Sequence, residues 1–166
     1  MMMIGMGMFA SDNGASGNCQ KKAILMVHFG TTFDEARASS IDAINALAKQ
    51  DFPDYEVRDA FTSRIVMKRL AERGVVKENP QQALLKLAAD GYTEVFIQPT
   101  NIIDGIEHAS LRQEAEYMAP FFKDIRVGRP LLYSVDDCEA VAQIIATRHA
   151  AAVKRNGGVV LVGHGT

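Results

Sequence analysis

His164 is the residue in this sequence whose setting most favours chemistry. It follows the apolar run 159–162 and stands between Gly163 and Gly165. Four apolar residues in a row indicate a buried parallel strand, and the glycines permit a sharp turn that leaves the imidazole projecting from the strand's carboxyl end. A neutral imidazole there could bind a metal or act as a base near neutral pH. Because most metal sites need three or four ligands, a loop histidine with only a hydrogen-bonding role stays open as the alternative.

The other three histidines have weaker claims to chemistry. His28 ends an apolar run, and its predicted orientation, opposite to that of His164, favours a packed or edge position over a ligand. Glu107 and His108 lie together in a long loop, where a carboxylate and an imidazole could bind a metal or a haem iron. A solvent-exposed loop pair is the simpler interpretation of these two residues. His149 lies in a helical pattern and is expected at the surface.

Strand and helix patterns alternate along the chain from residue 21 onward. Apolar runs predict strands at 23–28, 55–61, 94–99, 125–128 and 159–162. Helical periodicity and capping residues predict helices that begin at Thr31 or Thr32, at Ser63, at Asn79, near Ser110 and at Ser134. This alternation predicts an α/β protein whose parallel sheet is flanked by helices on both faces, and the alternating strand 55–61 is expected nearer an edge.

Right-handed crossovers bring every strand-to-helix loop of such a sheet to the same edge, formed by the carboxyl ends of the strands. Open α/β sheets place their ligands at this carboxyl edge. We therefore expect the following residues to share it: His28, Thr62, Ser63, segment 101–108, Ser134 and His164.

Composition excludes several classes of function. The chain of 166 residues has a net charge of −2, so it lacks the basic surface of a nucleic-acid-binding protein. It has no apolar run long enough for a transmembrane helix. Its two cysteines are far apart and indicate neither a disulfide framework nor a zinc site.

Residues 1–20 form a leader that we exclude from the fold. A short methionine-rich apolar run precedes a small, polar segment, as at the end of a secretory signal that lacks its positive region. A disordered extension is the alternative. The first interpretation predicts a periplasmic protein, and the second a cytoplasmic one.

An internal repeat suggests how the chain is divided. Residues 24–31 and 159–166 each consist of four apolar residues, two variable ones and Gly-Thr. Because the two copies are about one domain length apart, residues 157–166 are predicted to open a second domain similar to the first, which spans 21–156. The sequence does not contain the remainder of that second domain.

Six segments carry a resemblance to a known family, in the order 22–31, 60–63, 80–92, 102–107, 130–132 and 162–165. Together they resemble the anaerobic cobaltochelatases of the CbiK type. These enzymes are class II chelatases, with protoporphyrin ferrochelatase as a more distant relative. The resemblance covers residues 21–166, and it depends on the whole set, because no single segment is specific.

The resemblance implies a lyase that inserts Co²⁺ into sirohydrochlorin, or precorrin-2, during anaerobic cobalamin biosynthesis. The family's fold consists of two similar α/β domains that face each other across a cleft. The resemblance makes His164 the first metal ligand and the acceptor of pyrrole protons. The second histidine and the glutamate of the family's site come from later in the second domain, so a truncated chain is expected to lack them.

The resemblance also implies the following substrate-binding residues at the loop ends: Phe29, Thr31, Thr62, Ser63 and Ser134. Some periplasmic relatives bind haem at a subunit interface, which would make His108 a possible haem ligand. Two alternatives remain: a homodimeric short chelatase, and a tetrapyrrole- or metal-binding module without catalysis. The identity of the metal is also open, because Co²⁺, Ni²⁺ and Fe²⁺ all accept imidazole.

Overall fold

A four-stranded parallel sheet forms the centre of the molecule. The computed structural model describes residues 20–160 and 162. Its strands are β1 (Lys22–His28), β2 (Glu56–Phe61), β3 (Glu94–Pro99) and β4 (Asp124–Val127), in the order β2-β1-β3-β4. The register places His28 beside Phe61 and Val27 beside Pro99. The alternating strand β2 lies at an edge of the sheet, as its sequence predicted.

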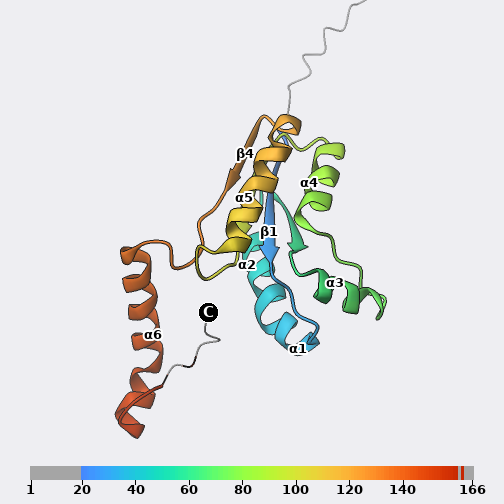
Figure 1. Cartoon of the computed structure of the whole chain (residues 1–166). Helices are drawn as coiled ribbons and strands as arrows, with labels where there is room; N and C mark the ends of the chain where they lie inside the picture. Colours follow the sequence, from blue (N-terminus) through green and yellow to red (C-terminus); the bar gives the residue numbers. More distant parts are fainter. Residues whose placement is uncertain (1–19, 161, 163–166) are drawn as a thin grey trace, which may run out of the picture.

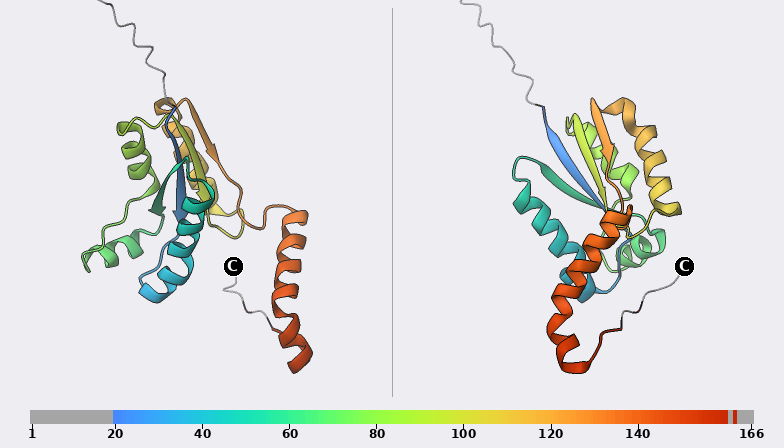
Figure 2. Two further views of the ribbon diagram at one scale, coloured as in Figure 1. Left: turned by 180° about the vertical axis from the view of Figure 1, so that it is seen from behind. Right: turned by 90° about the vertical axis from the view of Figure 1, so that its left-hand side faces the viewer.

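Helices cover both faces of this sheet (Figures 1 and 2), which confirms the predicted α/β architecture. After β1, the chain forms α1 (Asp34–Ala36), a π-helical segment η1 (Arg37–Asp42) and α2 (Ala43–Asp51). Between β2 and β3 lie α3 (Arg64–Ala71) and α4 (Pro80–Ala89). The remaining helices are α5 (Ile106–Met118), the short 3-10 helix η2 (Ala119–Phe121) and α6 (Val135–Asn156).

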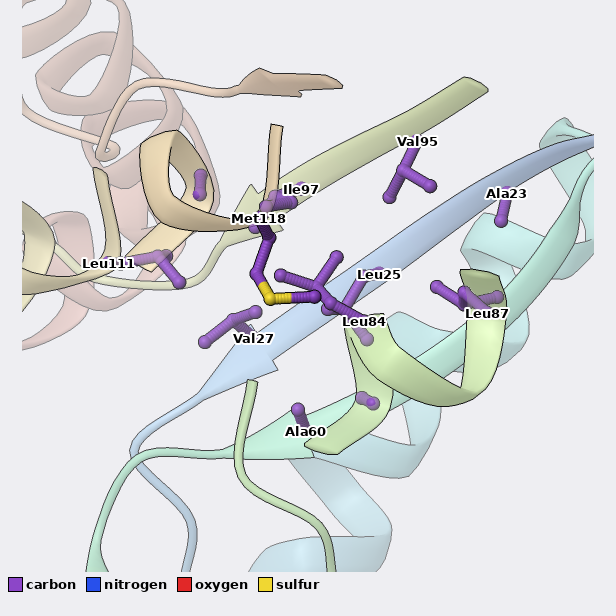
Figure 3. Close-up of a cluster of buried hydrophobic side chains, with 12 residues drawn as sticks. Ala23, Leu25, Val27, Ala60, Leu84, Leu87, Val95, Ile97, Leu111 and Met118 are labelled. Carbon is purple, nitrogen blue, oxygen red and sulfur yellow. The ribbon is translucent and has the colours of Figure 1, made fainter. Parts of the chain in front are cut away.

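The main hydrophobic core lies between the sheet and the helices α4 and α5 (Figure 3). Its buried side chains include Leu25, Val27 and Ile97 from the strands, Leu84 and Leu87 from α4, and Leu111 and Met118 from α5. A smaller cluster on the opposite face joins Ile24, Met26 and Val57 to Ala48 of α2. The central strand β1 therefore contributes to both cores and is buried along almost its whole length.

Local capping signals explain why three helices begin where the sequence predicted. The Asn79 side chain accepts a hydrogen bond from Gln82 N at 2.8 Å, and the Gln82 side chain accepts one from Asn79 N at 3.1 Å. Pro80 occupies the first position of α4, where its missing N–H has no cost. Ser63 and Ser134 cap α3 and α6 through their hydroxyl oxygens.

Two predicted helix starts are wrong. The first helix begins at Asp34 after Phe33, because Thr31 closes a local turn by accepting a hydrogen bond from Phe33 N at 3.2 Å. Helix α5 begins at Ile106 rather than near Ser110. Its N-cap residue is Gly105, which has no polar side chain to mark the start of a helix in the sequence. His108 consequently lies in the first turn of a helix and not in a loop.

The predicted closing strand 159–162 is not formed in the part of the chain that the structure describes. Val159, Val160 and Val162 lie outside any strand. Helix α6 projects away from the sheet (Figure 1). Residues 1–19, 161 and 163–166 lie outside the described residues, so the leader, the second domain and the domain boundaries stay predictions. Among the helices that are described, none is long and apolar enough to cross a membrane.

Candidate functional site

The loops that follow the strands meet at the carboxyl edge of the sheet, as predicted. Main-chain hydrogen bonds join them, from Thr62 N to His28 O at 2.9 Å and from Thr100 N to Val27 O at 2.9 Å. The loop after β4 joins the loop after β3 through a hydrogen bond from Leu131 N to Asn101 O at 3.0 Å. The four loops therefore form one connected surface.

Several exposed apolar side chains lie in these loops or in the first turn of the helix that follows. We call eight of them the apolar edge: Phe29, Phe33, Ile65, Ile102, Ile103, Ile106, Leu131 and Tyr133. The most exposed members are Phe33, at 74%, and Ile106, at 90%. Apolar surface gathered over several loops is typical of a site that binds an apolar ligand or partner. Of this set, the sequence placed Phe29 and, within segment 101–108, Ile102, Ile103 and Ile106 at the carboxyl edge.

Two of the cavities that open at the carboxyl edge contain an arginine. The first, of about 330 Å³, lies where the amino ends of α3, α4 and α5 converge, and Thr62, Arg64 and Glu114 contribute to its lining. Burial raises the pKa of the Glu114 carboxyl, and the positive charge of Arg64 opposes this shift. The second cavity, of about 510 Å³, includes Thr100 and Arg129. Each cavity thus combines apolar walls with one guanidinium group.

His28 is buried beneath the carboxyl edge, with 2% of its surface exposed. Its Nδ1 lies 3.0 Å from Thr100 Oγ1, and its Nε2 lies 3.0 Å from Asn45 Oδ1. The ring also meets the Phe61 ring edge-on, with 6.2 Å between centroids. Burial lowers the pKa of His28, while the Asn45 hydrogen bond opposes this shift. The sequence-based interpretation of His28 as a packed residue is confirmed.

His108 is equally buried, so the interpretation of a solvent-exposed loop pair is wrong. Its Nδ1 lies 2.8 Å from Asp104 Oδ1 and its Nε2 lies 3.1 Å from Gly128 O. Because the helix begins at Ile106, the imidazole turns inward and joins the loop after β3 to the end of β4. Both ring nitrogens have protein partners, and the role of His108 as a haem ligand stays a prediction.

The five predicted substrate-binding residues have different surroundings in the structure. The hydroxyl oxygens of Ser63 and Ser134 are occupied as helix caps. Phe29 is half exposed at the carboxyl edge, and the Thr31 side chain supports the turn after β1. The Thr62 hydroxyl oxygen is buried and has no hydrogen-bond partner within the described structure. The substrate-binding role of all five residues stays a prediction.

His164, the predicted metal ligand and catalytic residue, lies outside the described residues. Within residues 20–160 and 162, no three histidine, cysteine or acidic side chains lie close enough together to hold a metal ion. The role of His164 therefore also stays a prediction.

Residues 22–166 match the family of the cobalt chelatase CbiK. The chain belongs to this family. The sirohydrochlorin cobaltochelatase of Salmonella typhimurium is 35% identical over 146 residues, which are 87% of this chain and 55% of that protein. Sirohydrochlorin cobaltochelatase CbiKC of Nitratidesulfovibrio vulgaris is 34% identical over 148 residues, which are 88% of this chain and 52% of that protein. The chain spans about half the length of these two relatives.

The segments that resemble the cobalt chelatases lie mainly at the carboxyl edge. Segment 22–31 contains β1 and the start of its loop, and segment 60–63 contains the end of β2 and the cap of α3. Segment 102–107 spans the loop after β3, and segment 130–132 lies in the loop after β4. Four of the six family segments thus meet where the structure exposes the apolar edge.

Proposed function

We propose that the protein acts in the insertion of Co²⁺ into sirohydrochlorin during cobalamin biosynthesis, and that its carboxyl edge binds the tetrapyrrole. The apolar edge is the observation that carries this proposal beyond family membership. A tetrapyrrole is a broad, flat ring with carboxylates at its periphery. It requires an apolar surface beneath the ring and cationic or polar groups around it, and the edge offers both.

Each part of the edge has a distinct task in this proposal. Phe29, Phe33 and Ile106 cover one side of the ring and exclude water from it. Arg64 and Arg129 meet peripheral carboxylates at the two cavities. The Arg129 guanidinium lies 5.2 Å from the centre of the Tyr133 ring, which orients its charge.

Cobalt is a substrate in this reaction. We propose that His164 holds Co²⁺ through a neutral imidazole nitrogen and accepts a pyrrole proton as the metal enters the ring. Insertion releases pyrrole protons, so a base close to the ring lowers the barrier.

Binding and metallation can be measured separately with the purified protein. Titration with sirohydrochlorin, followed by its fluorescence, tests binding, and added Co²⁺ tests metallation through the change in absorbance. We expect His164→Ala to abolish metallation and to leave ring binding nearly unchanged. Metallation that survives His164→Ala would remove this residue from its role. Ring binding without metallation would favour a binding module, and sedimentation of the same samples would test for a homodimer.

The periplasmic location is a proposal that depends on the leader. Fractionation of cells that express the protein with and without residues 1–20 tests it. Export only when the leader is present would support a secretory signal, and equal retention in the cytoplasm would contradict it.

A further inference from the structure

His28 contacts three of the four loops of the carboxyl edge. It is the last residue of the central strand β1 and directly precedes the loop that begins at Phe29. Its carbonyl oxygen accepts a hydrogen bond from Thr62 N in the loop after β2, at 2.9 Å. Its imidazole reaches Thr100 at the start of the loop after β3. Neither the family match nor the proposed reaction assigns a task to this side chain.

We infer that His28 is a positioning residue, which holds the loops of the carboxyl edge in the arrangement that receives the tetrapyrrole by linking Thr100 to Asn45 of α2. The inference rests on the proposed function for the identity of the ligand. The loop that Thr100 begins carries Ile102 and Ile103, two members of the apolar edge. Fixing Thr100 therefore fixes where these side chains stand.

The partners of the two ring nitrogens of His28 determine which nitrogen carries the hydrogen. The Thr100 hydroxyl oxygen lies 3.2 Å from Val27 O and 3.0 Å from His28 Nδ1. The Asn45 side-chain oxygen can only accept, so in a neutral ring Nε2 carries the hydrogen and donates to Asn45 Oδ1. Nδ1 is then the acceptor, and the Thr100 hydroxyl donates to it. Val27 O keeps the hydrogen bond that it accepts from Thr100 N at 2.9 Å.

The charges around His28 come from three directions and largely cancel. Asp59 of β2 and Asp42 of η1 favour the protonated ring, while Lys77, in the segment before α4, disfavours it. Lys77 Nζ and Asp59 Oδ2 form an ion pair at 2.5 Å. Burial is the largest influence and lowers the pKa of His28. The ring is accordingly neutral at neutral pH, so that Nε2 donates to Asn45 and Nδ1 accepts from Thr100.

Three substitutions of His28 separate its hydrogen bond to Thr100 from its hydrogen bond to Asn45. His28→Leu removes both hydrogen bonds, while His28→Asn can place its amide oxygen near the position of Nδ1 and still accept from Thr100. His28→Gln places its amide nearer the position of Nε2 and can meet Asn45 but not Thr100. Thr100→Val removes the hydrogen bond between Thr100 and His28 by changing Thr100 instead, with little change of volume. This variant keeps the inference testable even if His28→Leu does not fold.

Hydrogen exchange of the amides in residues 100–105 and sirohydrochlorin affinity are the two measurements. We expect His28→Leu, His28→Gln and Thr100→Val to speed exchange and to weaken binding about tenfold, the effect of one lost buried hydrogen bond. His28→Asn should restore both properties to within about twofold, and His28→Leu combined with Thr100→Val should add little to either single change. His149→Leu, on α6, is the control and should change neither measurement.

The outcomes distinguish this inference from the proposed function. Unchanged exchange in both His28→Leu and Thr100→Val would overturn the inference, and so would failure of His28→Asn to restore the loop. Faster exchange with unchanged affinity would overturn it as well, because the loops would then move without affecting the ligand. If the unsubstituted protein binds no sirohydrochlorin, the proposed function fails and the inference fails with it as a statement about ligand binding. The exchange data alone would then show whether His28 holds the loops.

Discussion

The two edges of the sheet differ in their balance of ion pairs and exposed apolar side chains, although the amino edge also exposes Phe52 and Phe121. At the amino edge, charged residues pair with one another, as in Lys22–Glu94 at 3.3 Å and Arg58–Asp90 at 2.6 Å. At the carboxyl edge, aromatic and aliphatic side chains stand in solvent. Exposed apolar surface contributes nothing to folding, because it is hydrated in both the folded and the unfolded chain. This difference fits the proposed function, in which the apolar edge binds the ligand and the amino edge serves the fold.

The largest effect is expected at Gly30, where the chain turns from β1 into the carboxyl edge. Its φ of +97° lies in the left-handed region, and an added Cβ would stand 2.9 Å from Cε2 of Phe61. We expect Gly30→Ala to lower the free energy of unfolding by about 3 kcal/mol, through backbone strain and overpacking together. Urea denaturation measures this loss.

Gly74 provides the matched control for this change. Its φ is +79°, but nothing lies within 4 Å of an added Cβ. Gly74→Ala should therefore show only the backbone part of the effect, about 1 kcal/mol. Equal losses in the two variants would mean that the Phe61 ring does not constrain the turn.

The second prediction tests whether the apolar edge serves a ligand rather than the fold. Phe33→Ser and Ile106→Ser should each change the free energy of unfolding by less than about 0.5 kcal/mol, because both side chains are exposed. Each should weaken sirohydrochlorin binding about tenfold through the loss of apolar contact area. Fluorescence titration measures the affinity.

Phe121, in η2 directly before β4, is the control aromatic residue at the amino edge, with 59% of its surface exposed. Phe121→Ser should leave the affinity unchanged. If it weakened binding as much as Ile106→Ser, exposed apolar groups at the two edges would be equivalent and the comparison would fail.

The third prediction concerns the pH dependence that His28 brings to the carboxyl edge. Burial holds its pKa in the folded protein below the ordinary value of 6.5, so the unfolded chain takes up the proton first as pH falls. The stability that His28 contributes is therefore complete above about pH 6.5 and declines below it. The contribution of Glu114 to stability changes with pH in the opposite direction, because burial raises its pKa and acid then favours the folded state.

Glu114 is present in both His28→Asn and the unsubstituted protein, so the difference between their pH-dependent stabilities reports on His28 alone. Urea denaturation between about pH 7.5 and pH 5.5 should show a smaller loss of stability on acidification in the variant. If the free energy of unfolding changed with pH equally in the two proteins, the buried ring would not resist protonation.

Local signals predicted most of the fold and little of the site. Asn79, Ser63 and Ser134 could be assigned as caps because a cap is formed by residues three positions apart. The start of α5 was missed because Gly105 provides no side-chain signal. Placing His108 in a loop was the consequence.

The exposure of the apolar edge and the partners of His28 could not be found from local patterns. Ile65 fits the spacing of a buried helical face, yet it lies in the first turn of α3 and faces solvent. Segment 101–108 was placed at the carboxyl edge, but its pattern did not show that Ile106 would be exposed in the first turn of a helix. Asn45 and Thr100 are 17 and 72 residues from His28 in sequence, so only the folded sheet brings them together. His164 was singled out by its glycine neighbours, and the described residues do not test it.

The smallest effect is expected at the amino edge. Arg58 pairs with Glu56 and Asp90 and lies 5.4 Å from the centre of the Tyr92 ring. Because surface ion pairs contribute little, Arg58→Gln should lower the free energy of unfolding by about 1 kcal/mol or less, and added salt should reduce the difference. Sirohydrochlorin affinity should stay unchanged, since Arg58 lies at the other end of the sheet from the apolar edge. A loss of affinity like that of Ile106→Ser would contradict this division of roles, because a residue that serves the fold would then also determine ligand binding.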